Sequence, residues 1–221
     1  VLINTYYLFQ FDRKTMGSSF YVPILMFFLT SIFIMFQDGD AYMGIIIIQG
    51  VFIPFTCWGF MYRLVEVYED GAKETLVPFY TKWIVFDALR YIVLNTGSLL
   101  LLSGLFMMKY GSEALTLLNV VHVILLMVFF QFLGSTLVVL FKNIELALTL
   151  VFIYTIIEVI TLGQFMPWPH IFIFEKPLSF FDMFGFSKVL SLIIYIPLLI
   201  FLTMILLKNV NRKVISLKRE Q

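Results

Sequence analysis

The sequence predicts an all-α membrane protein in which six helices cross the bilayer and pack as a single bundle. Hydrophobic residues make up 61% of the 221-residue chain, charged residues only 13%, and the mean hydropathy is +0.98. These values lie far from those of a soluble domain. The apolar residues gather into runs long enough to cross roughly 30 Å of hydrocarbon as helices. None of these runs alternates as a membrane β-strand does.

Six apolar runs have the length that a membrane helix requires. Polar breaks separate the runs, and the insertion 163–188 separates the fifth from the sixth. The expected spans are 21–36, 43–61, 91–108, 115–141, 146–162 and 189–207.

Lys and Arg residues are distributed unequally between the two ends of this predicted bundle. Of the fifteen, twelve fall on one side and only Lys109, Lys176 and Lys188 fall on the other. Because loops rich in Lys and Arg stay in the cytoplasm, both termini are expected to be cytoplasmic. The basic tail 208–221 either lies against anionic headgroups or serves only as a stop signal for the sixth helix.

The chain 1–221 is expected to form one domain, since it shows no convincing repeat and no low-complexity linker. Residues 1–20 mix aromatic side chains with Asp12, Arg13 and Lys14, which is typical of an interfacial segment. The proline-containing insertion 163–188 is expected to dip into the outer leaflet and return. Irregular backbone at that depth must be covered by helices, so this re-entrant segment should cap the bundle.

The most charged stretch follows the second span. Glu66, Glu69 and Asp70 are spaced to form one acidic face on a helix that continues below the membrane. Gly71 permits a sharp reversal, and Pro78 is expected to limit the next helical piece. A short element at 72–77 is therefore expected at a bend, although a solvated loop joining two helices is also open.

Acidic residues, Gly, E-T-L and a Pro directly after a second span resemble the permease subunits of ABC transporters of the type-2 exporter family. In that family this stretch forms the coupling helix, which seats in the ATP-binding subunit. Ala72 stands where the family has Thr, and Thr75 follows Glu74 instead. The resemblance implies an ATPase-coupling interface within the cytoplasmic segment 63–82, formed by Glu66, Glu69, Asp70, Gly71, Lys73, Glu74, Thr75, Leu76 and Pro78.

The resemblance also implies a function and partners. It implies the permease of an ATP-driven exporter, working by alternating access as a dimer with a second permease subunit. A bacterial plasma membrane is the expected location, because the permease would be compact and lack a large extracellular domain. The chain lacks a GxxxxGK[ST] motif, so ATP and Mg are expected on a separate ATPase subunit, and this chain is expected to be non-catalytic. The apolar spans suit an amphipathic or hydrophobic cargo, such as a peptide or a lipid-like molecule.

Three polar residues within the predicted spans are candidates for a translocation path or a subunit contact. Glu158 is the only acid well inside a span, and a tolerated structural glutamate is the alternative. His122 and Gln131 are nine residues apart on one helix, so they point to nearly opposite faces and are expected to hydrogen-bond neighbouring helices instead. Asp87 and Arg90 are spaced to form an ion pair.

Two other function classes compete with a permease. An intramembrane protease needs a reactive constellation at membrane depth, and two histidines with one buried acid supply little for it. An ion-coupled carrier or channel needs discontinuous helices or polar rings, for which Pro54 and several glycines are possible break points.

The single Cys57 excludes a disulfide within the chain. Scattered basic residues argue against nucleic acid as a partner, and no metal site is expected.

Overall fold

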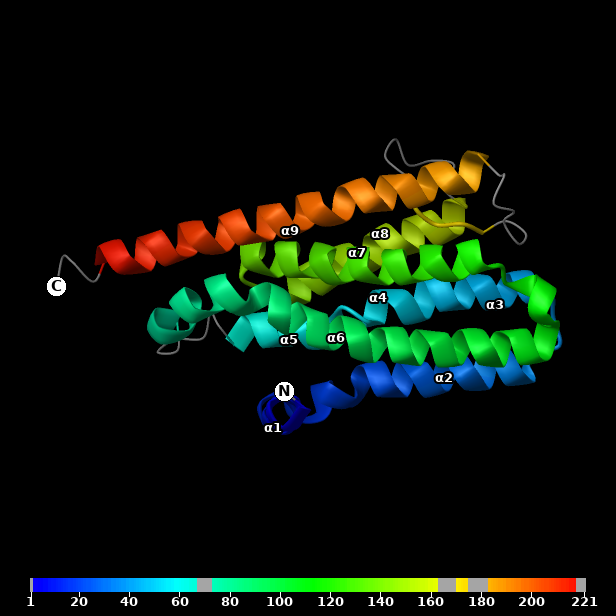
Figure 1. The fold of residues 1–221 in the computed structure, drawn as a ribbon, viewed down its shortest axis with the longest axis horizontal. Coiled ribbons are helices and arrows are strands. Elements are labelled where there is room, and N and C mark those ends of the chain that lie inside the picture. The colour runs from blue at the N-terminus through cyan, green and yellow to red at the C-terminus, as the bar shows by residue number, and fades with distance from the viewer. Residues whose placement is uncertain (1, 67–72, 163–169, 175–182, 218–221) are drawn as a thin grey trace.

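The computed structural model describes the backbone of residues 2–66, 73–162, 170–174 and 183–217, and their side chains except at 2–6, 8, 73–83, 184 and 211–217. Within these ranges six helical segments are long and apolar enough to cross a membrane. They lie lengthwise beside one another, and the first described helix, Leu2–Met16, lies toward the same end of the bundle as the last described turns before Leu217 (Figure 1). The predicted fold class is confirmed, and the chain is a multi-pass membrane protein.

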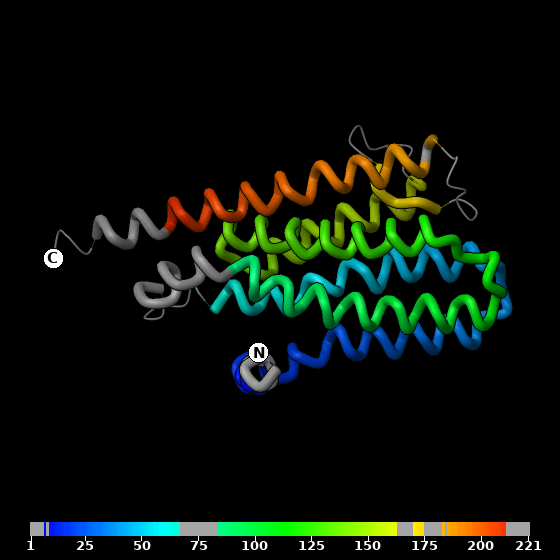
Figure 2. Tube along the Cα trace, in the orientation of Figure 1, coloured from blue at the N-terminus to red at the C-terminus, as the bar shows by residue number. Residues whose placement is uncertain are grey.

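The spans lie close to the predicted ranges. The helices are α1 (Leu2–Met16), η1 (Gly17–Tyr21), α2 (Val22–Phe36), α3 (Ala41–Ile47), η2 (Ile48–Phe52), α4 (Ile53–Phe55), α5 (Trp58–Glu66), α6 (Lys73–Tyr110), η3 (Ser112–Ala114), α7 (Leu117–Phe141), α8 (Ile144–Thr161) and α9 (Met183–Leu217). The second span comprises α3 to α5, and the other five consist mainly of α2, α6, α7, α8 and α9. The trace of these spans can be followed in Figure 2.

The first helix does not run along the bundle. Figure 1 shows α1 nearly end-on, whereas α2 lies lengthwise. The turn between them starts at Gly17, whose φ of 57° lies in the left-handed region that glycine adopts readily. A single turn of 3-10 helix, η1, then leads into α2, which has Pro23 in its first turn, where a missing N–H costs nothing. The N-terminal helix therefore lies across one end of the bundle.

The second span differs from the single helix expected at 43–61. It contains a π-helical turn, η2, directly before Pro54, which supplies no N–H to the helix, and a non-helical turn at Thr56 and Cys57. Asn95 Nδ2 on α6 donates to the carbonyl of Thr56, within the non-helical turn, at 2.9 Å. The interruption is thus stabilised by a side chain from another span.

The third span belongs to a longer helix than predicted. α6 begins at Lys73 and continues without a break through Pro78. The prediction of a separate short element at 72–77 is therefore wrong for residues 73–77, which belong to α6. Pro78 is the sixth residue of α6, where it removes only one backbone hydrogen bond near the helix end. Such a position bends or weakens a helix less than a proline at its centre would.

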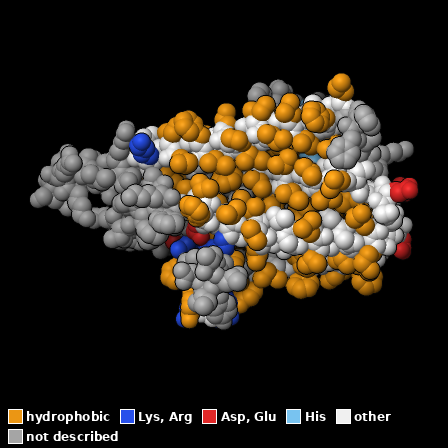
Figure 3. Space-filling view, in the orientation of Figure 1, with side chains coloured by type: hydrophobic (Ala, Val, Ile, Leu, Met, Phe, Trp, Pro, Cys, Tyr) orange, Lys and Arg blue, Asp and Glu red, His pale blue; other side chains and the backbone are white. Residues whose placement is uncertain are grey.

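α7 is the central helix, since it packs against α5, α6, α8 and α9. Gly134 allows a close approach between α7 and α5, because a Cβ there would lie 2.6 Å from Met61 Sδ on α5. The start of α7 is fixed by a capping box between Thr116 and Asn119, and Asn143 caps α8. Hydrophobic side chains cover the middle of the face shown in Figure 3, as expected of a surface that faces lipid.

Candidate functional site

Two buried polar networks lie at opposite ends of the bundle. One joins α1 to α5 and α6, near the chain termini, and the other surrounds residues 170–174 at the far end (Figure 1). Charged and hydrogen-bonding groups are costly at membrane depth and are therefore candidates for function.

The first network centres on Asp12, whose side chain is fully buried. Its Oδ2 lies 2.8 Å from Arg90 Nη2 and accepts a hydrogen bond from the Tyr91 hydroxyl at 2.8 Å. Its Oδ1 lies 3.9 Å from Arg63 Nε. One carboxylate of the N-terminal helix is thus held by two arginines, one from α5 and one from α6.

Asp87 completes the network between the two arginines. The Asp87 carboxylate lies 2.8 Å from Arg90 Nη2 and 3.6 Å from Arg63 Nε. Arg63 also pairs with Glu66 at 2.5 Å, one turn along α5. The predicted pair between Asp87 and Arg90 is therefore present, but it forms part of a larger Asp12 network of Asp12, Arg63, Glu66, Asp87, Arg90 and Tyr91.

Aromatic rings of α1 cover the arginines of the Asp12 network. The Arg63 guanidinium lies 4.9 Å from the Phe11 ring centroid, and the Arg90 guanidinium lies 4.9 Å from that of Phe9. Such cation–π contacts are attractive and add to the ion pairs. α1 is therefore attached to the bundle by both charge and aromatic packing.

The Asp12 network lies on both sides of the predicted coupling segment. α5 ends at Glu66 and α6 starts at Lys73, so the network connects the two helices that flank residues 67–72. Among the predicted interface residues, the structure describes the side chain of Glu66. Glu69, Asp70 and Gly71 lie outside the described residues. Lys73, Glu74, Thr75, Leu76 and Pro78 lie in the first turns of α6, with side chains outside the described ones.

The second network surrounds a short non-helical segment, residues 170–174, which we call the strap. Ile171, Phe172, Ile173 and Phe174 are 0–6% exposed, although they form no helix or strand. The Phe172 ring packs against Phe130 at 5.8 Å and stacks with Phe174 at 5.5 Å between centroids. This part of the predicted re-entrant segment is thus inserted among the helices, and the remainder of 163–188 before Met183 lies outside the described residues.

Side chains from three spans bind three consecutive backbone carbonyls of the strap. His122 Nε2 donates to Ile171 O at 2.6 Å, and Lys188 Nζ donates to Phe172 O at 2.5 Å. Gln49 Nε2 donates to Ile173 O at 2.9 Å, while Gln49 Oε1 accepts from Ile173 N at 3.1 Å. Since a carbonyl only accepts, the His122 proton lies on Nε2. These bonds provide hydrogen-bond partners for backbone groups that lie away from water and outside any helix or strand.

Glu158 is also part of this end. Its side chain is fully buried, and its Oε1 lies 3.3 Å from His170 Nδ1, at the first residue of the strap. Within the described part of the chain, Glu158 Oε2 has no hydrogen-bond partner. A buried carboxyl oxygen without a hydrogen-bond partner costs free energy, so Glu158 remains a candidate for a functional role.

The structure separates the three intramembrane candidates. His122 and Glu158 both contact the strap, whereas Gln131 donates to the Ala88 carbonyl of α6 at 2.8 Å. His122 and Gln131 therefore have different partners, as their nine-residue spacing predicts. Gln131 makes the expected interhelical bond, but the partner of His122 is the strap and not a helix.

Sequence reasoning missed the contributions of Gln49 and Asp12. Gln49 is a polar residue inside the second apolar run, the same signal that drew attention to Gln131. Asp12 is an acid among aromatic residues, which indicated an interfacial segment but gave no hint of its partners 51 and 78 positions later.

Comparison with protein families, with curated proteins and with solved structures finds no match for this chain.

Proposed function

We propose that this chain is the permease subunit of an ATP-driven ABC exporter, working with a separate ATPase subunit and a second permease subunit. The observation that carries the proposal is the Asp12 network at the two helix ends that flank residues 67–72. A partner that pushes on this segment would act on α1, α5 and α6 together, because their ends are joined by buried ion pairs. Helix ends connected in this way move as one unit, as coupling to a separate ATPase subunit requires.

The strap supports a transport role at the other end. Its backbone is held by side-chain bonds from separate spans, so relative movement of those spans would change its hydrogen bonding. Alternating access requires one end to close while the other opens, and a segment held in this way can take part in that closure. The proposed direction is outward, with an amphipathic or hydrophobic cargo and the Asp12 network on the cytoplasmic side.

Co-purification tests this proposal. The tagged chain, extracted from its own membranes in mild detergent, is expected to bring down an ATPase whose activity rises when both are placed in vesicles. Gly71→Pro and Glu74→Lys should abolish the co-purification, whereas Asp38→Lys, an exposed acid at the opposite end, should leave it intact. Absence of any ATPase rejects the exporter. An ATPase retained and stimulated in both variants rejects only the coupling segment.

A second candidate, an ion-coupled carrier, is favoured by the interrupted second span, since carriers often bind ions where helices break. At this break, however, the Thr56 carbonyl accepts from Asn95, and the Cys57 thiol donates to the Pro54 carbonyl at 2.9 Å. Carbonyls already paired with protein donors are less available to an ion. Cargo movement driven by an ion gradient in ATP-free vesicles would favour this candidate over the exporter.

A further inference from the structure

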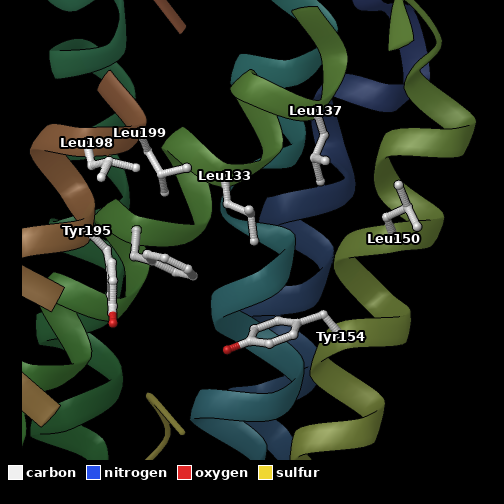
Figure 4. Close-up of a pocket in the computed structure, with 8 residues that line it drawn as sticks. Leu133, Leu137, Leu150, Tyr154, Tyr195, Leu198 and Leu199 are labelled. Carbon is white, nitrogen blue, oxygen red and sulfur yellow. The ribbon is translucent and has the colours of Figure 1, made fainter. Parts of the chain in front are cut away.

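A groove lies between α8 and α9 on the outside of the bundle. Both helices pack along α7, but they make few contacts with each other. The space between them has a volume of about 530 Å³ and is lined by Phe129, Leu133, Leu137, Leu150, Tyr154, Tyr195, Leu198 and Leu199. Figure 4 shows the α7 leucines between α8 on one side and α9 on the other.

The depth of the groove is defined by the helices that line it. Phe129 is at the middle of α7, and Leu137 lies four residues before its end. At 1.5 Å per residue, the α7 side of the groove runs for ~12 Å through one half of the span. Half of a hydrocarbon core is ~15 Å thick, so the groove crosses most of one leaflet. A leaflet-deep apolar groove fits an acyl chain in shape and chemistry.

Two lysines stand where the headgroup of such a chain would lie. Thr136 and Thr203 are hydrogen-bonded at 2.7 Å, which places these positions of α7 and α9 at one depth. Lys142 is six residues beyond Thr136, and Lys208 is five residues beyond Thr203, so both lie ~7–9 Å further toward the same end. Both side chains are exposed.

The charge at this end favours an anionic headgroup. Glu145, in the first turn of α8, is the one described acid near Lys142 in sequence. Lys142, Lys208 and Glu145 together carry a net charge of +1. The start of α8 adds the partial positive charge of a helix N-terminus. A phospholipid with a negatively charged headgroup therefore matches both ends of the site.

We propose that the groove between α8 and α9 binds one acyl chain of an anionic phospholipid, whose headgroup lies at Lys142 and Lys208. The lipid fills the space that the divergence of α8 and α9 leaves over α7. This site is separate from the strap and from the Asp12 network, and it does not depend on the proposed exporter function.

Quenching of tryptophan fluorescence by brominated lipid tests the site. The reporter is Tyr195→Trp, in a background with Trp58→Phe, Trp83→Phe and Trp168→Phe. The matched control is Phe201→Trp, which is 66% exposed on the same helix but outside the groove. The protein is reconstituted in phosphatidylcholine vesicles that contain increasing fractions of phosphatidylglycerol or phosphatidylcholine brominated at mid-chain.

The groove reporter is expected to reach half-maximal quenching at a several-fold lower fraction of brominated phosphatidylglycerol than of brominated phosphatidylcholine. Each lysine near the headgroup should contribute up to about fivefold in affinity, and Glu145 offsets part of that gain. Lys142→Gln with Lys208→Gln should therefore remove the difference between the two lipids. The control position should respond almost equally to both lipids.

Two results would overturn the proposal. Equal quenching of the groove reporter by both lipids would mean that bulk lipid fills the groove without selection. A groove reporter that neither lipid quenches, beside a control that both quench, would mean that protein, such as a second copy of the chain, covers the groove.

Native mass spectrometry gives a measurement that needs no tryptophan variant. The unmodified protein should retain one phosphatidylglycerol per chain after extraction from mixed vesicles. The double variant Leu150→Phe with Leu198→Phe fills the groove and should lose this bound phosphatidylglycerol, whereas Phe201→Leu should retain it. Retention by the filled variant would contradict the proposed position.

Discussion

The side-chain amide of Gln49 pairs twice with the backbone of Ile173, donating from Nε2 to the carbonyl at 2.9 Å and accepting from the N–H at 3.1 Å. An extended residue presents its N–H and C=O on the same side, as in a hydrogen-bonded pair of antiparallel strands. Gln49 thus takes the place of a neighbouring strand for one residue of the strap. The two residues are 124 positions apart, so this bond joins the second span to the insertion before the sixth.

Replacement of Gln49 should release the strap. Gln49→Leu keeps the volume but leaves the buried N–H and C=O of Ile173 without partners, at about 1–3 kcal/mol each. Thermal unfolding in detergent should shift to lower temperature, and backbone hydrogen exchange at residues 170–174 should accelerate. Gln131→Leu is the matched control, since Gln131 is equally buried and also donates to a carbonyl. It should lower stability without faster exchange in the strap, and unchanged exchange in Gln49→Leu would contradict the role of Gln49.

Removal of the Asp12 carboxylate should detach the N-terminal helix. Asp12→Ala leaves Arg63 and Arg90 with fewer acids in a buried network, and breaking such a pair costs about 3–5 kcal/mol. Trypsin should then cleave faster after Arg13 and Lys14, which are both exposed. Asp38→Ala, an exposed acid at the other end, should leave the cleavage rate unchanged. Equal cleavage rates for the two variants would show that the aromatic contacts of α1 hold it without Asp12.

The six spans could be predicted from sequence because each depends on a local property, a long apolar run bounded by polar residues. Interruptions within a span were harder to predict. Pro54 marked a possible break in the second span, but the turn there is stabilised by Asn95, which is 39 residues beyond the carbonyl that it binds. Pro78 was expected to limit a helix, and it lies inside one. The effect of a proline depends on which partners its neighbours find, and sequence alone does not identify them.

The polar networks could be predicted only in part. Asp87 and Arg90 lie one helical turn apart, so their pair was expected. The bonds from Asp12 to Arg90 and from Gln49 to Ile173 join segments far apart in the chain, and no local pattern indicates them. Glu158 could be recognised from the sequence as an acid inside a span. Its contact with His170 could not be predicted, because no local pattern indicates it.

Lys109 and Lys188, which lie at the end of the bundle that is poor in Lys and Arg, have hydrogen-bond partners in the structure. Lys188 donates to the strap, and Lys109 Nζ donates to the carbonyls of Ile34 at 2.8 Å and Met35 at 3.2 Å, as well as to that of Gln37. The last carbonyls of a helix lack intrahelical partners, and a cation there is favoured by the helix dipole. These two lysines are therefore explained by local bonding at the end opposite the termini.

Lys109→Met should loosen the end of α2. The charged hydrogen bonds to the α2 carbonyls are worth about 1–3 kcal/mol in total, because water near the membrane boundary replaces part of what is lost. The unfolding midpoint should fall, and hydrogen exchange should increase at residues 33–38. Lys14→Met, an exposed lysine on α1, should change neither measurement. If Lys109→Met behaves like Lys14→Met, water already satisfies these carbonyls in the folded protein.

The threonine pair between α7 and α9 should couple only weakly, despite its short distance. Thr136 Oγ1 and Thr203 Oγ1 are 2.7 Å apart, but each also lies within 2.8 Å of its own i−4 carbonyl, at Phe132 and Leu199. Each hydroxyl has one proton, so the pair can form only at the expense of one of these local bonds.

A double-mutant cycle with Thr136→Val and Thr203→Val measures that coupling. The expected value is about 0.6 kcal/mol, the average for hydrogen bonds between membrane helices, because each single variant leaves the other threonine bonded to its own helix. Asn95→Leu provides the contrast, since it orphans the Thr56 carbonyl and should cost about 1–3 kcal/mol alone. A threonine coupling above about 1.7 kcal/mol would exceed what such bonds have shown and would mean that the local bonds do not compete.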